Sequence, residues 1–207
     1  MNIHTYPLGQ MQANCYLLEQ DSEAILIDPG DSADFLLEKI SSQNLKLIGI
    51  IATHGHFDHI MAVGEIQLSY PNLPLYIHPK DQFLLKRVVE TANHFLGFEP
   101  AVIPITSTKD LVIGKFQISK FKFQILYSPG HTPGSIAFYF KDNHVLFSGD
   151  TLFKAGVGRY DFSYSSKEDL KSSLQSLLSL PPDTIVYPGH GPETSIEEEQ
   201  GVIQLIP

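Results

Sequence analysis

Apolar and polar residues alternate in blocks that predict a mixture of strands and helices along the whole chain. Short runs rich in Ile, Leu, Val and aromatic residues, bounded by Gly, Pro or polar residues, are typical of strands. Such runs occupy residues 2–8, 14–19, 23–28, 47–52, 73–79, 115–119, 121–127, 136–140, 144–147 and 183–187. Apolar residues at helical spacing predict helices over residues 32–42, 57–68, 80–92 and 165–180, and residues 93–108 lack periodicity and predict a loop. Periodicity alone supports only a mixed α and β protein.

Local signals place the ends of two of these helices. Asp31 or Ser32 fits the N-cap of the first helix. Ser165-x-x-Glu168 matches a capping box, and Pro181-Pro182 ends the helix that follows it. The run Glu197-Glu198-Glu199 is expected on the solvated face of a helix.

Composition predicts one domain over residues 1–207, because 43% apolar content in 207 residues can form a substantial single core. The net charge of −9 and the lack of a basic stripe argue against nucleic acid as a partner. One cysteine, Cys15, cannot form an internal disulfide and is expected to be a buried strand residue. The start lacks a signal peptide and no run has transmembrane length, so we expect a cytoplasmic protein without a membrane partner. A secreted chain that has lost its signal peptide is the alternative.

The densest chemistry lies in Thr53-His54-Gly55-His56-Phe57-Asp58-His59, directly after the predicted strand 47–52. Side chains of an extended chain alternate faces, so all four donors cannot serve one metal from a straight strand. If the backbone turns near Phe57, His54 and His56 can bind one ion while Asp58 and His59 reach a second. Imidazoles and carboxylates suit zinc, iron or manganese, and the lack of thiolates argues against a purely structural zinc site. The alternative is a His-rich surface loop with no metal.

This T-H-x-H-x-D-H motif resembles that of the metallo-β-lactamase superfamily. Three later segments resemble the family's third-histidine loop, its bridging-aspartate strand end and its last-histidine loop. They are residues 128–135, 147–153 and 187–191. Because the four motifs extend from residue 53 to residue 191, the resemblance covers nearly the whole chain. It implies an α/β fold of the αββα sandwich type, with two similar halves.

The resemblance also implies a ligand set. One metal ion would be held by His54, His56 and His131, and a second by Asp58, His59 and His190. Asp150 would bridge them, and Asp28 would orient a ligand histidine, although a turn aspartate at the end of a strand is the alternative for Asp28. Two such ions, most simply zinc with iron or manganese as alternatives, share a water and activate it as a bridging hydroxide. Asp58 and Asp150 are then the expected catalytic residues.

The expected reaction is hydrolysis, because the chain has no G-x-S-x-G motif and Cys15 lies far from every ligand motif. A thiol with a pKa of about 8.5 can leave as a thiolate, whereas an amine must be protonated before it can leave. No dedicated acid is evident beyond the site's own water and Asp58, which favours a small-molecule thioester as the substrate. Residues 149–159 are similar to glyoxalase II, the hydroxyacylglutathione hydrolases, which implies substrate contacts from Arg159 and Tyr160.

Two departures from glyoxalase II put glutathione in question. Asp161 stands where that family has a tyrosine, and no C-terminal helical domain follows His190. An ion pair between Arg159 and Asp161 that shapes the loop is therefore the alternative to substrate binding.

Two other functions are weighed against the hydrolase. The first is a mononuclear iron oxygenase that resembles the persulfide dioxygenases and uses His54, His131 and Asp150. The second is a non-catalytic binding domain, which would be expected to have lost ligands, whereas none is missing here. The sequence does not indicate the oligomeric state.

Overall fold

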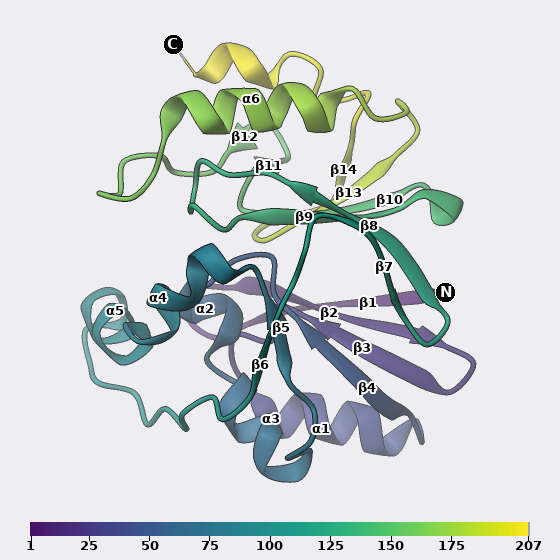
Figure 1. Cartoon of the computed structure of the whole chain (residues 1–207), viewed down its shortest axis with the longest axis vertical. Coiled ribbons are helices and arrows are strands. Elements are labelled where there is room, and N and C mark those ends of the chain that lie inside the picture. Colours follow the sequence, from purple (N-terminus) through teal and green to yellow (C-terminus); the bar gives the residue numbers. More distant parts are fainter. Residues whose placement is uncertain (207) are drawn as a thin grey trace.

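Two six-stranded sheets pack face to face in the computed structural model, which describes residues 1–206 (Figure 1). The first sheet contains, in spatial order, β1 (Asn2–Leu8), β2 (Ala13–Gln20), β3 (Glu23–Ile27), β4 (Lys46–Ile51), β5 (Leu75–Ile77) and β6 (Thr108–Asp110). The second contains β14 (Thr194–Ser195), β13 (Ile185–Pro188), β10 (Val145–Gly149), β9 (Ile136–Phe140), β8 (Phe121–Tyr127) and β7 (Gly114–Ile118). A separate hairpin joins β11 (Leu152–Phe153) to β12 (Gly156–Val157).

Helices cover the outer faces of both sheets, as Figure 1 shows. Those on the side of the first sheet are α1 (Ala33–Ser42), α2 (Phe57–Ile60), α3 (Val63–Ser69), α4 (Gln82–Leu85) and α5 (Val88–Leu96). The second sheet is covered by α6 (Lys167–Leu178). Three 3-10 turns are η1 (Pro79–Asp81), η2 (Lys141–Asn143) and η3 (Val202–Leu205). The expected αββα sandwich is confirmed. No helix within residues 1–206 is long and apolar enough to cross a membrane.

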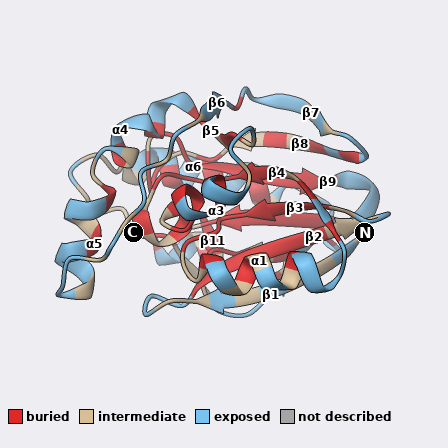
Figure 2. Ribbon diagram, turned by 90° about the horizontal axis from the view of Figure 1, so that it is seen from below, coloured by how far each residue is buried: buried red, intermediate tan, exposed pale blue. Residues whose placement is uncertain are grey.

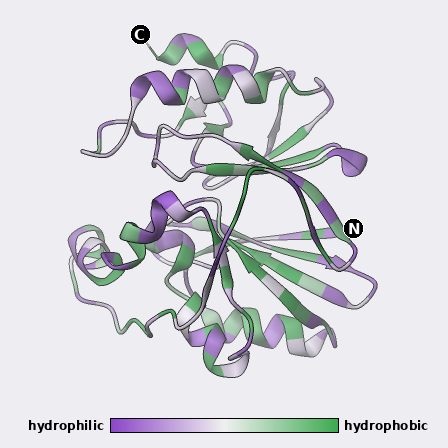
Figure 3. Cartoon of the chain, in the orientation of Figure 1, coloured by the Kyte–Doolittle hydropathy of each residue, from purple (hydrophilic) through white to green (hydrophobic). Residues whose placement is uncertain are grey.

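Alternation along the strands divides the buried side chains between layers. In β3, Ala24 and Leu26 pack under the helices, while Ile25 and Ile27 point between the two sheets. Figure 2 shows the central strands as buried, whereas the outer surfaces of the helices and much of the edge strand β7 are exposed, and Figure 3 shows the central strands as mostly hydrophobic. Full burial of an Ile side chain stabilises a fold by about 1.5–3 kcal/mol relative to exposure. These layers therefore fix which strand ends can meet at one edge of the sandwich.

Strand direction explains where the ligand motifs lie. Strands β3, β4 and β5 are parallel, and so are β10 and β13. Parallel strands place their carboxyl ends at one edge, and polar residues follow the ends of β4, β10 and β13 there. The segment 128–135 joins antiparallel strands β8 and β9, so it turns at one end of this hairpin.

The helix expected over residues 57–68 is instead two short helices, α2 and α3. The helix breaks because the Ala62 N–H donates a hydrogen bond to the Pro29 carbonyl, 3.2 Å away, instead of to a carbonyl of its own helix. The turn at Gly30 packs so closely here that a β-carbon on Gly30 would overlap the Asp58 carbonyl oxygen. The helix expected over residues 80–92 is likewise divided into η1, α4 and α5, and α5 continues to Leu96.

Of the two cap predictions, Ser32 at α1 is confirmed as the N-cap position, and the capping box at α6 was wrong by one residue. Ser166, not Ser165, caps α6 by accepting a hydrogen bond from the Asp169 N–H, with an O···N distance of 3.2 Å. Ser165 is used elsewhere, because its hydroxyl donates to the His131 carbonyl at 2.8 Å. Ser32 occupies the N-cap position of α1 without bonding a helix N–H, since its hydroxyl donates to Asp31.

Glu199 was wrongly expected on a solvated helix face. It lies in a turn after β14 and is only 5% exposed. Its carboxylate accepts hydrogen bonds from the Thr194 hydroxyl at 2.7 Å and the Ala155 N–H at 2.9 Å. These bonds tie the hairpin after Asp150 to the C-terminal segment.

Candidate metal centre

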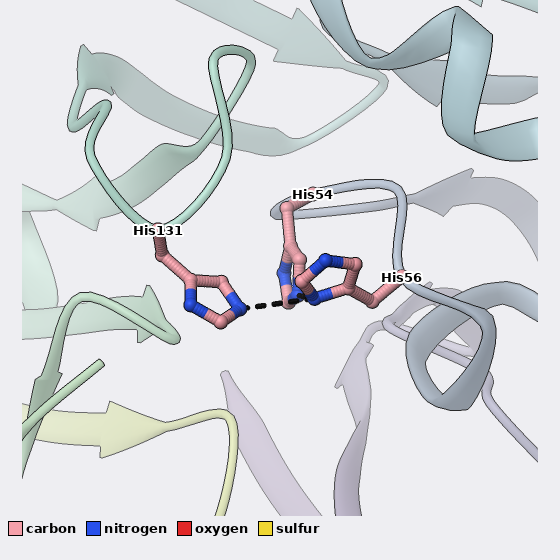
Figure 4. Close-up of side chains that lie close together, drawn as sticks. All are labelled: His54, His56 and His131. Atoms are coloured by element: carbon pink, nitrogen blue, oxygen red, sulfur yellow. Dashed lines mark hydrogen bonds between the residues drawn. The ribbon is translucent and has the colours of Figure 1, made fainter. Parts of the chain in front are cut away.

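The first donor group consists of His54, His56 and His131, whose rings converge from two loops (Figure 4). Nδ1 of His56 lies 2.9 Å from Nε2 of His131 and 3.1 Å from Nε2 of His54. Two atoms bound at about 2.1 Å to one tetrahedral ion lie about 3.4 Å apart. The three nitrogens thus have close to the spacing that a single small cation requires.

The second donor group consists of Asp58, His59 and His190. Nε2 of His190 lies 3.3 Å from both Oδ2 of Asp58 and Nε2 of His59. Nε2 of His59 is 3.8 Å from Oδ2 of Asp58. The turn into α2 at Phe57 carries Asp58 and His59 away from His56, so the four donors of one short motif divide between two groups.

Asp150 lies between the two groups. Its Oδ2 is 3.4 Å from Nε2 of His131 and 3.7 Å from Nε2 of His190, and its Oδ1 is 3.5 Å from Nε2 of His59. Oδ1 is buried and has no hydrogen-bond partner among the described residues. A β-carbon on Gly189 would fall 2.0 Å from this oxygen, so only glycine leaves room for it. A buried, unpartnered carboxylate oxygen among imidazole nitrogens fits cation ligation.

Two histidines of the first group, His54 and His56, are held in the neutral form at neutral pH. Burial, reinforced by the neighbouring His59 and His56, lowers the pKa of His54 well below its usual range. Burial and the neighbouring His131 lower the pKa of His56 to about 3. Neutral imidazoles are the form that binds metal ions, so these nitrogens need lose no proton.

The second group attracts positive charge. Burial acts to lower the pKa of His59, but Asp58, Asp150 and Asp28 outweigh it and raise that pKa to about 10. Burial acts to raise the pKa of Asp58, but His59 and His190 hold it well below the usual range. Burial likewise acts to lower the pKa of His190, whereas Asp58 and Asp150 raise it. This group therefore gathers carboxylates that stabilise a cation.

Asp28 orients the second group from behind. Its Oδ2 lies 3.1 Å from Nδ1 of His59 and accepts from the Thr53 hydroxyl at 2.6 Å, and its Oδ1 accepts from the Thr53 N–H at 2.7 Å. The His59 contact fixes Nε2 as the nitrogen that faces the donor group. Asp28, His54 and His59 also lie close enough to form a metal-binding trio. We assign Asp28 to orientation instead, because both of its oxygens already accept hydrogen bonds.

Asp81 supports the first group, and no sequence motif marked it. It is fully buried, and its Oδ2 accepts from the Gly55 N–H at 2.9 Å and the Thr132 hydroxyl at 2.6 Å. Its Oδ1 accepts from the Gly134 N–H at 2.6 Å. Gly55 stands between His54 and His56, and Thr132 follows His131. One carboxylate therefore joins the two loops that present the three imidazoles.

Asn14 supports the loop that carries His190, and it too was missed. Its side-chain amide donates to the Pro188 carbonyl at 3.0 Å and the Gly191 carbonyl at 2.8 Å, and its backbone N–H donates to Gly189 at 2.7 Å. A residue of β2 thus holds a loop 176 positions later in the chain. Only the tertiary fold brings these segments together.

A cavity of about 290 Å³ opens onto both donor groups. Its floor includes His56, Asp58, His131, Asp150 and His190. Its walls are mostly aromatic, with Phe57, Phe95, Phe153, Phe162 and Tyr164 among the lining residues. Concave sites with apolar walls and a few convergent polar groups are typical of small-molecule binding.

Arg159 lines this cavity, whereas Tyr160 is not among the described residues that do. The Tyr160 ring packs against the cluster beneath α6, and Phe162 and Tyr164 occupy the cavity wall instead. The ion pair considered as an alternative is present, because both Arg159 Nε and Nη2 lie 2.9 Å from Asp161 carboxylate oxygens. The Arg159 carbonyl oxygen is also 2.8 Å from Nδ1 of His131, which leaves Nε2 facing the donor group.

An αββα sandwich with His and Asp donors gathered at the strand ends defines a class of metal-binding enzymes. Residues 8–190 match the family model described as "Metallo-beta-lactamase superfamily". This chain belongs to that superfamily, which confirms the resemblance inferred from its four motifs.

Two relatives of similar length match nearly the whole of this chain. "Probable metallo-hydrolase YqgX" of Bacillus subtilis is 36% identical over 199 residues, 94% of this chain and 92% of that protein. "Hydroxyacylglutathione hydrolase GloC" of Haemophilus influenzae is 36% identical over 206 residues, 97% of this chain and 95% of that protein. The resemblance to glyoxalase II thus extends over almost the whole chain.

Solved structures share the fold. One described as TTHA1623 in a di-iron-bound form is 39% identical with a TM-score of 0.88, covering 96% of this chain and 98% of that one. One described as BLEG-1 B3 metallo-beta-lactamase is 35% identical with a TM-score of 0.86, covering 96% of each chain. ETHE1 from Myxococcus xanthus is 26% identical with a TM-score of 0.80, covering 100% of this chain and 84% of that one.

Proposed function

We propose that this chain hydrolyses small-molecule thioesters with two divalent metal ions, most simply zinc, with iron or manganese as alternatives. His54, His56 and His131 would hold one ion, Asp58, His59 and His190 the other, and Asp150 both. The observation that carries the proposal is the position of Asp150, between two donor groups and with a buried oxygen that lacks a hydrogen-bond partner among residues 1–206. When bound, such a pair of ions polarises a carbonyl group and lowers the pKa of a water molecule toward neutrality.

The protein's own residues would position the reactants. Asp28 and the Arg159 carbonyl fix the nitrogens that His59 and His131 present. Asp58 is the proposed catalytic residue that orients the attacking water by accepting a hydrogen bond from it, because Asp58 lines the cavity. Aromatic walls exclude bulk water from the reacting carbonyl.

A thioester is favoured by its leaving group. A thiol leaves as a thiolate at neutral pH, so this reaction does not require the strong acid that an amide does. The similar GloC protein is named a hydroxyacylglutathione hydrolase, which supports the same substrate class. For Arg159 we propose a contact with an anionic part of the substrate at the rim of the cavity. Its guanidinium is already paired with Asp161, so the substrate anion must compete with that carboxylate. We propose no nucleic-acid or membrane partner, and a cytoplasmic location stays a prediction from composition.

A second candidate is a mononuclear iron oxygenase acting on persulfides, because His54, His131 and Asp150 could supply its two histidines and one carboxylate. The three donors Asp58, His59 and His190 weigh against it, because a single iron held by His54, His131 and Asp150 has no need for a second convergent group.

The test combines elemental analysis with a substrate panel on the purified protein. The panel contains S-lactoylglutathione, lactoyl and acetyl esters of small thiols, a lactone, a β-lactam and glutathione persulfide, with an oxygen electrode for the last. Two metals per chain and thioester cleavage without oxygen uptake are expected. One iron and oxygen uptake with the persulfide would replace the hydrolase with the oxygenase. His94→Ala serves as the control, because His94 lies outside both donor groups, and it should keep metal content and activity.

A further inference from the structure

Tyr164 reaches the first donor group from the segment between β12 and α6. Its hydroxyl oxygen lies 2.8 Å from Nε2 of His56, and its ring lines the cavity. Two aromatic neighbours hold the ring, because Phe162 stacks on it at 5.6 Å between centroids and Phe83 meets it edge-on at 5.5 Å. The side chain is half-buried and lines the cavity that opens onto both donor groups.

The direction of this hydrogen bond follows from the way His56 is placed. Nδ1 of His56 faces His54 and His131, so it is the nitrogen that would bind a metal ion. An imidazole that uses one nitrogen as a ligand carries its proton on the other. The His56 Nε2–H therefore donates, and the Tyr164 oxygen accepts. The hydroxyl proton of Tyr164 is not used in this bond, and no hydrogen-bond acceptor for it is found among the described residues.

We propose that Tyr164 donates this proton in a hydrogen bond to the acyl oxygen of the substrate, and so acts as a catalytic residue. The inference rests on the proposed hydrolysis. Water adds to the carbonyl carbon, a C–O bond forms, and the π electrons move to the acyl oxygen. When the carbonyl re-forms, the C–S bond breaks and sulfur leaves with the electron pair. The products are a carboxylate, a thiolate and two protons, one of which the thiolate can take. Tyr164 keeps its own proton throughout and stabilises the charge on the acyl oxygen.

A donor already aimed at the position where charge develops lowers the barrier without reorganisation. Loss of one such donor costs about 10²–10³ in kcat in a buried oxyanion site. Tyr164 is half-exposed, so we expect a smaller loss for Tyr164→Phe, about 10–100-fold in kcat. KM should change little, because the acyl oxygen gains its charge only during the reaction.

The matched control is Tyr160→Phe. Tyr160 packs under α6 instead of lining the cavity, so this variant removes a nearby phenol hydroxyl and should keep full activity. Both variants are loaded with metal to saturation and assayed with thioesters of several thiols. An equal kcat loss for every thiol in Tyr164→Phe supports the proposal. A loss that grows with the thiol pKa would overturn it, because the hydroxyl would then assist the leaving group. Recovery of full kcat at high metal concentration would also overturn it, because Tyr164 would then only hold His56.

A second measurement does not depend on turnover. In the cobalt(II)-loaded protein, the visible spectrum reports binding of lactate, whose carboxylate contains the former acyl oxygen. Tyr164→Phe should weaken lactate binding about tenfold, the value of one hydrogen bond to a charged group, and Tyr160→Phe should not. Unchanged lactate affinity in Tyr164→Phe would contradict the inference. If the wild-type protein cleaves no thioester, the proposed function fails, while the lactate measurement still tests Tyr164.

Discussion

The two donor groups of the metal centre use similar side chains but are built differently. His54, His56 and His131 contribute only imidazoles, and Asp81 holds their loops by accepting hydrogen bonds from two backbone N–H groups and a hydroxyl. The second group contains a carboxylate, and Asp28 contacts the His59 ring itself. One buried aspartate therefore fixes where loops lie, and the other fixes which nitrogen a histidine presents. From this difference we expect that a single substitution can weaken metal binding by one group and leave metal binding by the other unchanged.

The largest effect is expected from Asp150→Ala, which removes the carboxylate that lies between the two donor groups. Asp150 contacts His131 of the first group and His59 and His190 of the second. A shared metal ligand supplies several kcal/mol of transition-state stabilisation, so kcat should fall by about 10³ or more. Elemental analysis should show loss of metal from both positions. Full activity in this variant, or in wild-type protein treated with a chelator, would contradict the mechanism.

Asp28→Asn should damage the second group selectively. The amide can still accept from the Thr53 N–H, but an amide N–H facing Nδ1 of His59 would move the ring proton to Nε2, the nitrogen that must bind metal. Metal affinity at this position should fall by about 10–100-fold. Chelator competition monitored by the cobalt(II) spectrum measures it. Equal losses at both positions would remove the proposed distinction between the two groups.

Asp81→Asn should instead weaken metal binding by the first group. Three donors point at the Asp81 carboxylate, and an amide nitrogen in either orientation faces at least one of them. Leaving a buried donor unpaired costs about 1–3 kcal/mol of stability. Affinity should fall about tenfold at the first position and little at the second. Thermal unfolding of the metal-free protein and the same chelator competition test this, and a loss confined to the second position would refute it.

The smallest effect is expected from Asn14→Ala, which removes only the amide bonds to the His190 loop. Two unpaired carbonyls in a partly accessible loop should cost about 1–2 kcal/mol, because water can replace some of the lost bonding. The second position should lose metal affinity by a few-fold, and the first should be unchanged. Comparison of denaturant midpoints with and without metal separates the stability loss from the metal effect.

Much of the fold could be predicted from short-range patterns. The runs that became β1, β2, β3, β8 and β9 were recognisable because apolar residues and turn-forming neighbours lie within a few positions of one another. Element ends were less predictable. Ser166 replaced Ser165 as the α6 cap because Ser165 bonds to His131, 34 positions earlier in the chain.

The αββα class followed from the resemblance of four motifs to those of the metallo-β-lactamase superfamily. For this protein, the sequence by itself determined the kinds of donor and their grouping into those motifs. Those features depend on residue types and local spacing. Only the tertiary structure decided that Asp81, Asn14 and Tyr164 support or border the donors, and that Tyr160 points away from the cavity. Asp81 lies 26 residues from Gly55 and 51 from Thr132. No local pattern marks such a contact, because a buried carboxylate finds its partners only when packed layers bring separate loops to one edge.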